Sequence, residues 1–386
     1  MAKWEMVRLG DVSSFNMGQS PSSKSYNSIG EGLPFFQGKT DFGSMYPIVR
    51  MYCKEPKKTA DKHDILISVR APVGTVNIAS EICCIGRGLA SISQKEHISN
   101  FKYLFYFLKY KENDIARMGV GSTFKAISKK DLNAIELPLP PLPIQQNIAN
   151  ILDCATTLIK KRKTQIKNLD LLVKSRFVEM FGDPVTNDKD WPTAPIKDFA
   201  TVKIGPFGSL LHTEDYVENG IPLVNPSHIS QGQIVIDPKL TLTQKKYESL
   251  SAYAMKAGDV VLGRRGEMGR CAVVDNGEYL CGTGSMYIRI ERDYLPIMLQ
   301  RIISSDVVRM VLEDKAVGVT MKNLNAGVIA NLETIMPPLD LQNRFSDFIR
   351  AADKLKFVLQ QALDKQQLLY KSLMQKCFNG DIDLTG

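Results

Sequence analysis

The chain has 386 residues, of which 44% are hydrophobic, enough to build two or three cores and more than one ordinary domain needs. Its 49 Lys and Arg against 41 Asp and Glu give a net charge of +8, which favours a polyanionic partner without the basic excess of a histone-like protein. The N-terminus lacks an apolar signal region, and no stretch approaches the roughly 18 apolar residues of a membrane span. We therefore expect neither export nor membrane insertion.

Cysteine and histidine usage points away from disulfides and metals. The seven cysteines are odd in number, and none forms the C-x-x-C pair that structural zinc sites use. The four histidines are scattered, without the i, i+4 spacing of a helical metal site. The sequence predicts reduced thiols, a cytoplasmic protein and no bound metal.

The first half of the chain predicts a strand-rich domain followed by a long helix. After Trp4, the string DILISVRAPVG (64–74) suits a strand and a turn, and FKYLFYFLKY (101–110) suits a helix that packs on the strands. The string PLPPLP (138–143) can neither continue a helix nor sit in a central strand, so it predicts a rigid hinge. A charged amphipathic stretch follows and ends with KSRFVEMFGDP (174–184).

The second half repeats this order. Trp191 is followed by DVVLGRRGEMG (259–269), by PIMLQRIISSDVVRMVL (296–312), which predicts a helix, and by the hinge MPPL (336–339). A second amphipathic stretch ends with KSLMQKCFNGDID (371–383).

The spacing of the repeat locates its variable part. Gln145 and Gln342 lie 197 residues apart, as do the equivalent hinge prolines and the lysines near the helix ends, whereas the tryptophans lie 187 apart. The hinge and the helix therefore share one register, and the difference in length lies inside the domains.

The stretch after each hinge predicts a long helix with an apolar stripe. Apolar residues recur at intervals of three and four, as in a coiled coil. In the first helix they are Ile148, Leu152, Ala155, Ile159, Ile166, Leu169 and Val173, and in the second Phe345, Phe348, Ala352, Leu355, Leu359, Ala362, Leu369 and Leu373. Packing inside an ordinary bundle is the alternative. We favour two helices of roughly 55 Å that pair antiparallel as a rigid spacer.

The sequence thus predicts an α+β fold with a pseudo-two-fold internal repeat, in which two similar mixed α/β domains are separated by two long helices forming an antiparallel coiled coil. We expect domains at 1–144 and 186–341 and spacer helices at 145–185 and 342–386. A spacer of fixed length suits DNA, whose repeat is roughly 34 Å per turn. Because the domains differ in sequence, the expected target is asymmetric and bipartite, with an unread gap.

The ordered recurrence of these motifs resembles the specificity subunits of type I restriction-modification enzymes over essentially the whole chain. Each half resembles the family's target-recognition domain. That domain has an opening Trp-containing strand, a G-x-x-P or G-P-F-G-S turn, a D-[IV]-[LV]-[IL]-x-x-R-x-x-x-G core, a P-L-P-P-L-x-x-Q hinge and a long helix closing with F-x-x-G-D. The turns are GQSP (18–21) and GPFGS (205–209). The second hinge, MPPLDLQN (336–343), departs from the first because it lacks the extra proline and the second glutamine.

This resemblance implies a non-catalytic, DNA-binding subunit. Each domain would read one half of a bipartite site, and the helices would set the gap and dock two modification (methyltransferase) subunits, with restriction (nuclease and translocase) subunits as further partners. S-adenosylmethionine and ATP would bind to the partner subunits, so this chain is expected to hold no cofactor.

Two other classes of protein remain open. An enzyme that acts on DNA unaided would need catalytic motifs, and only near misses occur. GLPFFQGKT (32–40) has five residues between its glycines where a phosphate-binding loop has four, Asn225–His228 lacks the second proline and the aromatic of an adenine-gripping motif, and Glu313–Lys315 lacks a further carboxylate for a metal. A repressor-like or purely structural coiled-coil protein would have a palindromic target or none.

Candidate DNA contacts are polar residues beside the glycine turns, because cations bind phosphates and forked or amide donors read base edges. Arg264 and Arg265 rank highest, since adjacent arginines between a strand and Gly266 could serve a guanine and a phosphate. The candidates in the first domain are Gln19, Ser20, Lys39, Arg70, Ser122, Lys125 and Lys129. Those in the second domain are Lys203, Ser209, His212, Asn225, His228, Arg264, Arg265, Lys322 and Asn323.

Overall fold

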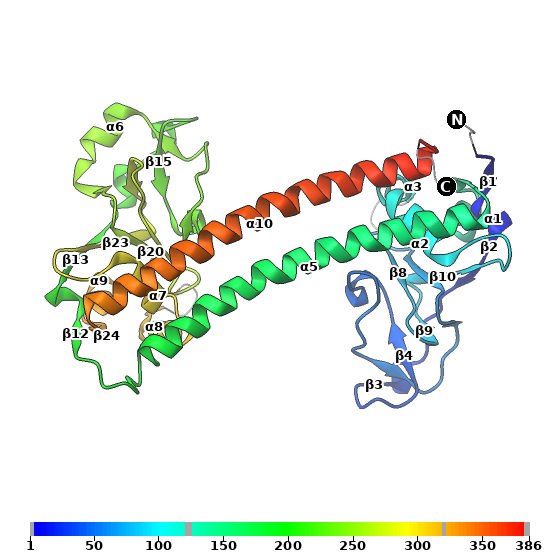
Figure 1. Cartoon of the computed structure of the whole chain (residues 1–386), viewed down its shortest axis with the longest axis horizontal. Coiled ribbons are helices and arrows are strands. Elements are labelled where there is room, and N and C mark those ends of the chain that lie inside the picture. The colour runs from blue at the N-terminus through cyan, green and yellow to red at the C-terminus, as the bar shows by residue number, and fades with distance from the viewer. Residues whose placement is uncertain (1–3, 120–125, 319–321, 382–386) are drawn as a thin grey trace. The chain divides into compact units, whose positions relative to one another are not determined.

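The computed structural model describes residues 4–119, 126–318 and 322–381. The chain forms two compact units, the first made of Met1–Gln165 with Leu359–Gly386 and the second of Ile166–Val358. Two long helices, α5 (Leu142–Phe181) and α10 (Leu339–Asn379), each contribute to both units (Figure 1).

An antiparallel four-stranded sheet forms the centre of the first unit, in the order β2-β10-β7-β8. Its strands are β2 (Ser13–Met17), β10 (Leu89–Gln94), β7 (Ile65–Ser68) and β8 (Val76–Ile78). Every residue of β7 is buried. Ile65 and Ile67 pack into the core formed with helix α2 (Phe101–Tyr110), and Leu66 packs into a second core on the other face. Alternate side chains of a strand point to opposite faces, so a strand buried on both sides is apolar throughout.

Short strands and helices complete the first unit. A five-stranded sheet in the order β3-β5-β4-β9-β6 covers the second face, and β4 and β9 are its parallel pair. A further pair, β1 and β11, joins the start of the unit to the hinge. The bounds are β1 (Met6–Arg8), β3 (Tyr26–Asn27), β4 (Leu33–Phe36), β5 (Tyr52–Cys53), β6 (Thr59–Ala60), β9 (Cys83–Ile85), β11 (Glu136–Pro138), α1 (Leu9–Val12), α3 (Glu112–Met118) and α4 (Lys129–Asn133).

The second unit repeats this topology, which confirms the predicted internal repeat of two similar mixed domains. Its four-stranded sheet is β13-β23-β20-β21, and its five-stranded sheet is β14-β18-β15-β22-β19, with β15 and β22 as the parallel pair. The four strands are β13 (Ala200–Ile204), β23 (Ser285–Ile290), β20 (Val260–Gly263) and β21 (Cys271–Val273). The five are β14 (Tyr216–Val217), β18 (Thr241–Leu242), β15 (Ile221–Val224), β22 (Tyr279–Cys281) and β19 (Ala254–Met255).

The other elements of the second unit correspond to those of the first, apart from a hairpin, β16 and β17, and helix α6. They are β12 (Thr193–Pro195), β24 (Glu333–Ile335), β16 (Ile229–Ser230), β17 (Gln233–Ile234), α6 (Gln244–Ser249), α7 (Pro296–Ile303), α8 (Asp306–Lys315) and α9 (Ala326–Ala330). The single helix predicted over 296–312 is wrong, because two serines interrupt it. Ser304 follows α7, and the Ser305 side chain accepts a hydrogen bond from Val308 N–H and so begins α8.

The expected tryptophan-containing strands are also shifted. Strand β1 begins at Met6 and β12 at Thr193, so each tryptophan lies two residues before its strand. The Trp191 ring Nε1 donates to the carbonyl oxygen of Phe181 at 3.0 Å, and Trp4 packs against the core of the first unit. Trp191 therefore ties the end of α5 to the second unit.

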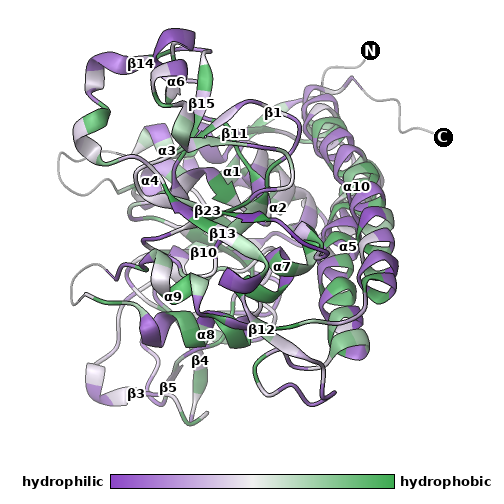
Figure 2. Cartoon of the chain, turned by 90° about the vertical axis from the view of Figure 1, so that its left-hand side faces the viewer, coloured by the Kyte–Doolittle hydropathy of each residue, from purple (hydrophilic) through white to green (hydrophobic). Residues whose placement is uncertain are grey.

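The two long helices run antiparallel within each unit. In the first unit Leu152 of α5 and Met374 of α10 belong to one core. In the second, the rings of Phe177 and Phe345 lie 5.6 Å apart, and Lys356 Nζ lies 2.7 Å from Asp170 Oδ1. Residues late in α5 thus meet residues early in α10, which agrees with the predicted antiparallel pairing. Figure 2 shows hydrophobic and hydrophilic residues mixed along both helices.

The predicted apolar stripe holds for α5 and is partly wrong for α10. All seven predicted positions of α5 are buried or half-buried. In α10, Leu355 and Leu369 are exposed, whereas Ile349 and Leu363 are buried. The residues three and four positions after a given residue both lie on its side of a helix. Where both are apolar, the sequence does not decide which of the two is buried. The packing against α5 selects the residue four positions after Phe345 and Leu359.

Candidate nucleic-acid interface

Four turns of the first unit meet at one end of its four-stranded sheet. They are residues 18–20, 37–39, 69–74 and 86–88, which we call the first turn cluster. Backbone hydrogen bonds join them: Gly18 N donates to Leu89 O at 2.9 Å, Gly86 N to Phe36 O at 2.8 Å and Val69 N to Gly88 O at 2.9 Å. The ends of four strands thus present their turns together.

The second unit builds the same arrangement from residues 205–209, 225–228, 264–269 and 282–284, the second turn cluster. Gly205 N donates to Ser285 O at 3.1 Å, Gly282 N to Val224 O at 2.9 Å and Arg264 N to Gly284 O at 2.9 Å. A Cβ on Gly205 would lie 2.0 Å from Gly282 O, and one on the equivalent Gly18 would lie 2.2 Å from Gly86 O. Only glycine permits this close approach of two turns.

The first turn cluster holds four of the residues predicted to contact DNA. Gln19, Lys39 and Arg70 are exposed there, while Ser20 Oγ accepts a hydrogen bond from Arg87 N at 3.3 Å. The four segments contain three cations, Lys39, Arg70 and Arg87, and no acidic residue. This edge of the unit is therefore suited to a polyanion.

Three further predictions fall beside the first turn cluster or outside the described residues. Lys129 is exposed as the first residue of α4, close in sequence to Ala126, which forms an isolated bridge with Arg70. Ser122 and Lys125 lie outside the described residues.

The adjacent arginines of the second turn cluster have different environments. Arg264 is half-buried, and its Nε donates to the Leu324 carbonyl at 3.1 Å. Burial, together with the neighbouring charge of Arg265, lowers the pKa of Arg264. Arg265 is exposed and forms a bridge with Asn323, as Arg70 does with Ala126. The structure thus makes Arg70 and Arg265 equivalent, and Arg264 takes the place of the buried Val69.

His228, one of the candidate DNA contacts, lies in a turn and is buried. Its side chain is buried, with Nδ1 2.8 Å from Leu223 O and 3.3 Å from Asn225 N. The imidazole therefore braces the turn that follows β15. Asn225 is half-buried against Gly282, where a Cβ would lie 2.3 Å from Asn225 Oδ1.

The remaining predictions of the second unit are distributed around its turn cluster. Ser209 and His212 are exposed on the segment after Gly205, and Lys203 is exposed on β13. Lys322 Nζ donates to the Glu313 carbonyl at 2.9 Å. Asn323 exchanges two backbone hydrogen bonds with Val317, at 3.1 and 2.9 Å.

Sequence reasoning missed the two residues at the centre of the clusters. Arg87 is exposed in the middle of the turn from β9 to β10, and Thr283 is half-buried in the middle of the turn from β22 to β23. The strings GRG (86–88) and GTG (282–284), 196 residues apart, carried a signal that could have found them.

The structure offers no metal site and no membrane helix among residues 4–119, 126–318 and 322–381. Nowhere in these ranges do three or more His, Cys, Asp or Glu side chains gather as metal ligands would. Within the same ranges, every helix is too short or too polar to cross a bilayer.

Comparison with known proteins identifies the family. A family model described as the type I restriction modification DNA specificity domain matches residues 1–168 and 188–368. The chain belongs to this family. It is a specificity subunit of a type I restriction-modification system, and the two matched segments cover most of both units.

Curated relatives from Methanocaldococcus jannaschii agree. The putative type I restriction enzyme MjaX specificity subunit is 53% identical over 170 residues, which cover 42% of this chain and 40% of that protein. The MjaVIII specificity subunit is 23% identical over 410 residues, covering 98% of this chain and 93% of the relative.

Solved structures share the fold. The type I S subunit from M. genitalium has a TM-score of 0.60 at 14% identity and covers 97% of this chain and 96% of its own. A chain from a study of complex assembly and conformational transition in a type I R-M system has a TM-score of 0.64 at 16% identity, with 98% of each chain covered.

Proposed function

We propose that each unit is a target-recognition domain that reads one half of an asymmetric, bipartite DNA sequence. The observation that carries this proposal is the repetition of one turn cluster with different side chains. The first cluster presents Gln19, Lys39 and Arg70, and the second presents Ser209 and Arg265. Arginine, lysine and amide donors bind phosphates and base edges, so two different sets of donors favour two different half-sites.

In this proposal α5 and α10 set the unread gap between the half-sites. They are uninterrupted helices of 40 and 41 residues, each about 60 Å long. Each core holds buried apolar residues from both helices, such as Leu152 and Met374 in the first unit and Phe177 and Phe345 in the second, and helices paired in this way resist bending. A gap set by helix length would change only when residues are added or removed.

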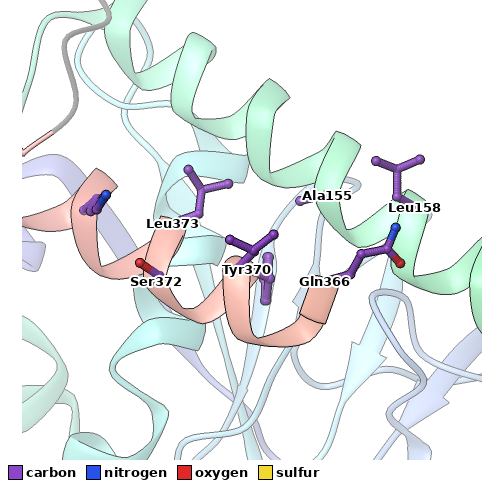
Figure 3. A pocket seen from close by; sticks show the side chains of 8 residues that line it. Ala155, Leu158, Gln366, Tyr370, Ser372 and Leu373 are labelled. Atoms are coloured by element: carbon purple, nitrogen blue, oxygen red, sulfur yellow. The ribbon is translucent and has the colours of Figure 1, made fainter. Parts of the chain in front are cut away.

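The helices also dock two modification subunits in this proposal. In the first unit a cavity of about 330 Å³ lies between α5 and α10 and is lined by Ala155, Leu158, Leu369 and Leu373, among others (Figure 3). Leu158 and Leu369 are exposed. In the second unit a cavity of about 250 Å³ lies beside the exposed Val178. Exposed apolar groups around a cavity are typical of protein interfaces, and each unit has one.

The chemistry belongs to the partners in this proposal. The chain alone neither methylates nor cleaves DNA and binds no cofactor, while S-adenosylmethionine and ATP bind to modification and restriction subunits in the cytoplasm. Assays of the isolated chain with both compounds test this point, because methyl transfer or cleavage would favour an unaided enzyme.

The decisive experiment is co-expression with the modification subunit, followed by mapping of methylated adenines across a genome. An asymmetric two-part motif with a fixed gap, absent when this chain is omitted, is the expected result. Methylation without this chain, or a single undivided or palindromic motif, would contradict the proposal.

A further inference from the structure

The turn between β9 and β10 holds a single side chain at the centre of the first turn cluster. Gly86 N donates to Phe36 O, Leu89 N donates to Gly86 O at 3.0 Å, and Gly88 O accepts from Val69 N. A Cβ on Gly88 would lie 2.3 Å from Gln37 O. The two glycines are therefore held between neighbouring turns, and Arg87 between them is presented by a rigid backbone.

The second unit repeats this turn bond for bond. Gly282 N donates to Val224 O at 2.9 Å, Ser285 N to Gly282 O at 3.0 Å and Arg264 N to Gly284 O at 2.9 Å. The residue held there is Thr283, which is half-buried. One backbone position thus carries different side chains in the two units.

Arg87 has the surroundings of a binding residue. Its backbone N–H donates to Ser20 Oγ, and the exposed Gln19, Gln37 and Lys39 lie on the adjoining turns. Among the described residues of the first unit, the basic partners in ion pairs are others: Lys54, Lys102, Lys111 and Arg117. The Arg87 guanidinium is therefore available to bind DNA. Its fork of N–H donors matches the O6 and N7 acceptors of guanine in the major groove.

We propose that Arg87 is a specificity-determining residue that donates to the O6 and N7 edge of one guanine in the half-site read by the first unit. This proposal rests on the proposed function. Thr283 has no forked donor, so the second unit reads a different base at the equivalent position.

The test is the substitution Arg87→Thr. Threonine is the residue that stands at the equivalent position of the second unit, as Thr283. The variant is co-expressed with the modification subunit, and the methylation motif is mapped. We expect one guanine of one half-site to become any base, while the other half-site and the gap stay unchanged. The preference of the purified complex for the original site over a site altered at that guanine should fall roughly 5- to 150-fold. The unchanged half-site reports that the variant folds and assembles.

Two further variants sharpen the result. Arg87→Lys keeps the charge and removes the fork, so it should also relax the choice of guanine. Arg8→Thr removes an exposed arginine that precedes the opposite end of β2, and it should leave the motif unchanged.

Each outcome has a distinct meaning. An unchanged motif in Arg87→Thr would overturn the inference. So would an even loss of affinity for all sequences with a salt dependence reduced by about one ion, since that is the behaviour of a phosphate contact. If the unsubstituted complex gave no two-part motif, the proposed function itself would fail.

Discussion

The Gln145 side chain is wholly buried, and its Oε1 accepts a hydrogen bond from the backbone N–H of Asn100 at 2.9 Å. Its Nε2 donates to the Pro140 carbonyl at 2.8 Å. Gln342 repeats both bonds, with Leu295 N at 2.9 Å and the Pro337 carbonyl at 2.8 Å. One glutamine in each unit therefore clamps the hinge and the start of a long helix to the domain. The departures in the second hinge leave this clamp intact.

Replacing Gln145 by leucine should lower the free energy of unfolding by about 1–3 kcal/mol, because a buried N–H and a buried carbonyl lose their partners. Urea unfolding followed by circular dichroism measures the change. Gln146→Leu is the control, since Gln146 is exposed and water can replace its bond to the Asn100 side chain. Equal stability of the two variants would show that the clamp does not stabilise the hinge.

Two leucines of α10, six residues apart, test the phase of its apolar stripe. Leu363 is 6% exposed and Leu369 is 67% exposed. Leu363→Ala should cost about 2–3 kcal/mol through lost burial and a residual cavity, and Leu369→Ala should change stability by less than about 0.5 kcal/mol. Thermal or urea unfolding of both variants gives the comparison. A larger loss for Leu369→Ala would restore the phase predicted from sequence.

Thiol reactivity should separate one cysteine from the other six. Cys154 is exposed and the others are buried. Burial raises the pKa of Cys83, Cys84 and Cys271 to about 12 and that of Cys377 to about 11. A raised pKa keeps these thiols protonated at pH 8, and the protonated thiol is not the nucleophile. Titration with an aromatic disulfide should find one fast thiol in the native protein and seven after denaturation.

The matched variant for this titration is Cys154→Ser. It should have no fast thiol and should denature normally. A second fast thiol in the native protein would show that one of the buried sites opens on the timescale of the reaction.

Lengthening both helices should lengthen the gap. Seven residues inserted after Gln165 in α5 and seven after Val358 in α10 preserve the phase of the stripes and add about 10 Å to each helix. At about 3.4 Å per base pair, the gap in the methylation motif should grow by about three base pairs, with both half-sites unchanged.

The control for the helix insertion places seven residues after Asn219, an exposed turn position with φ 59°. That variant should keep the original gap. If the gap also stayed constant in the helix variant, the helices would not set it.

Local pattern was enough to predict the repeat, the hinges and the long helices. Proline chemistry and apolar residues at intervals of three and four act within a few residues of chain, so PLPPLP and the stripe of α5 could be interpreted without knowing what they pack against. The same holds for β20, whose continuous apolar run VVLG reflects burial on both faces.

Tertiary structure alone decided the phase of α10 and the composition of the turn clusters. Leu355 and Leu369 satisfy the sequence pattern, but the position of α5 leaves them exposed. Arg264 and Arg265 are adjacent residues of the same type. Only the fold shows that Arg264 is the half-buried one, with its side chain bonded to the Leu324 carbonyl. Arg87 gained its place because its turn is hydrogen-bonded to Ser20, Phe36 and Val69, which lie in other turns and strands of the chain. Periodicity and turn chemistry are local properties that a sequence determines by itself, whereas exposure and proximity depend on contacts between distant segments.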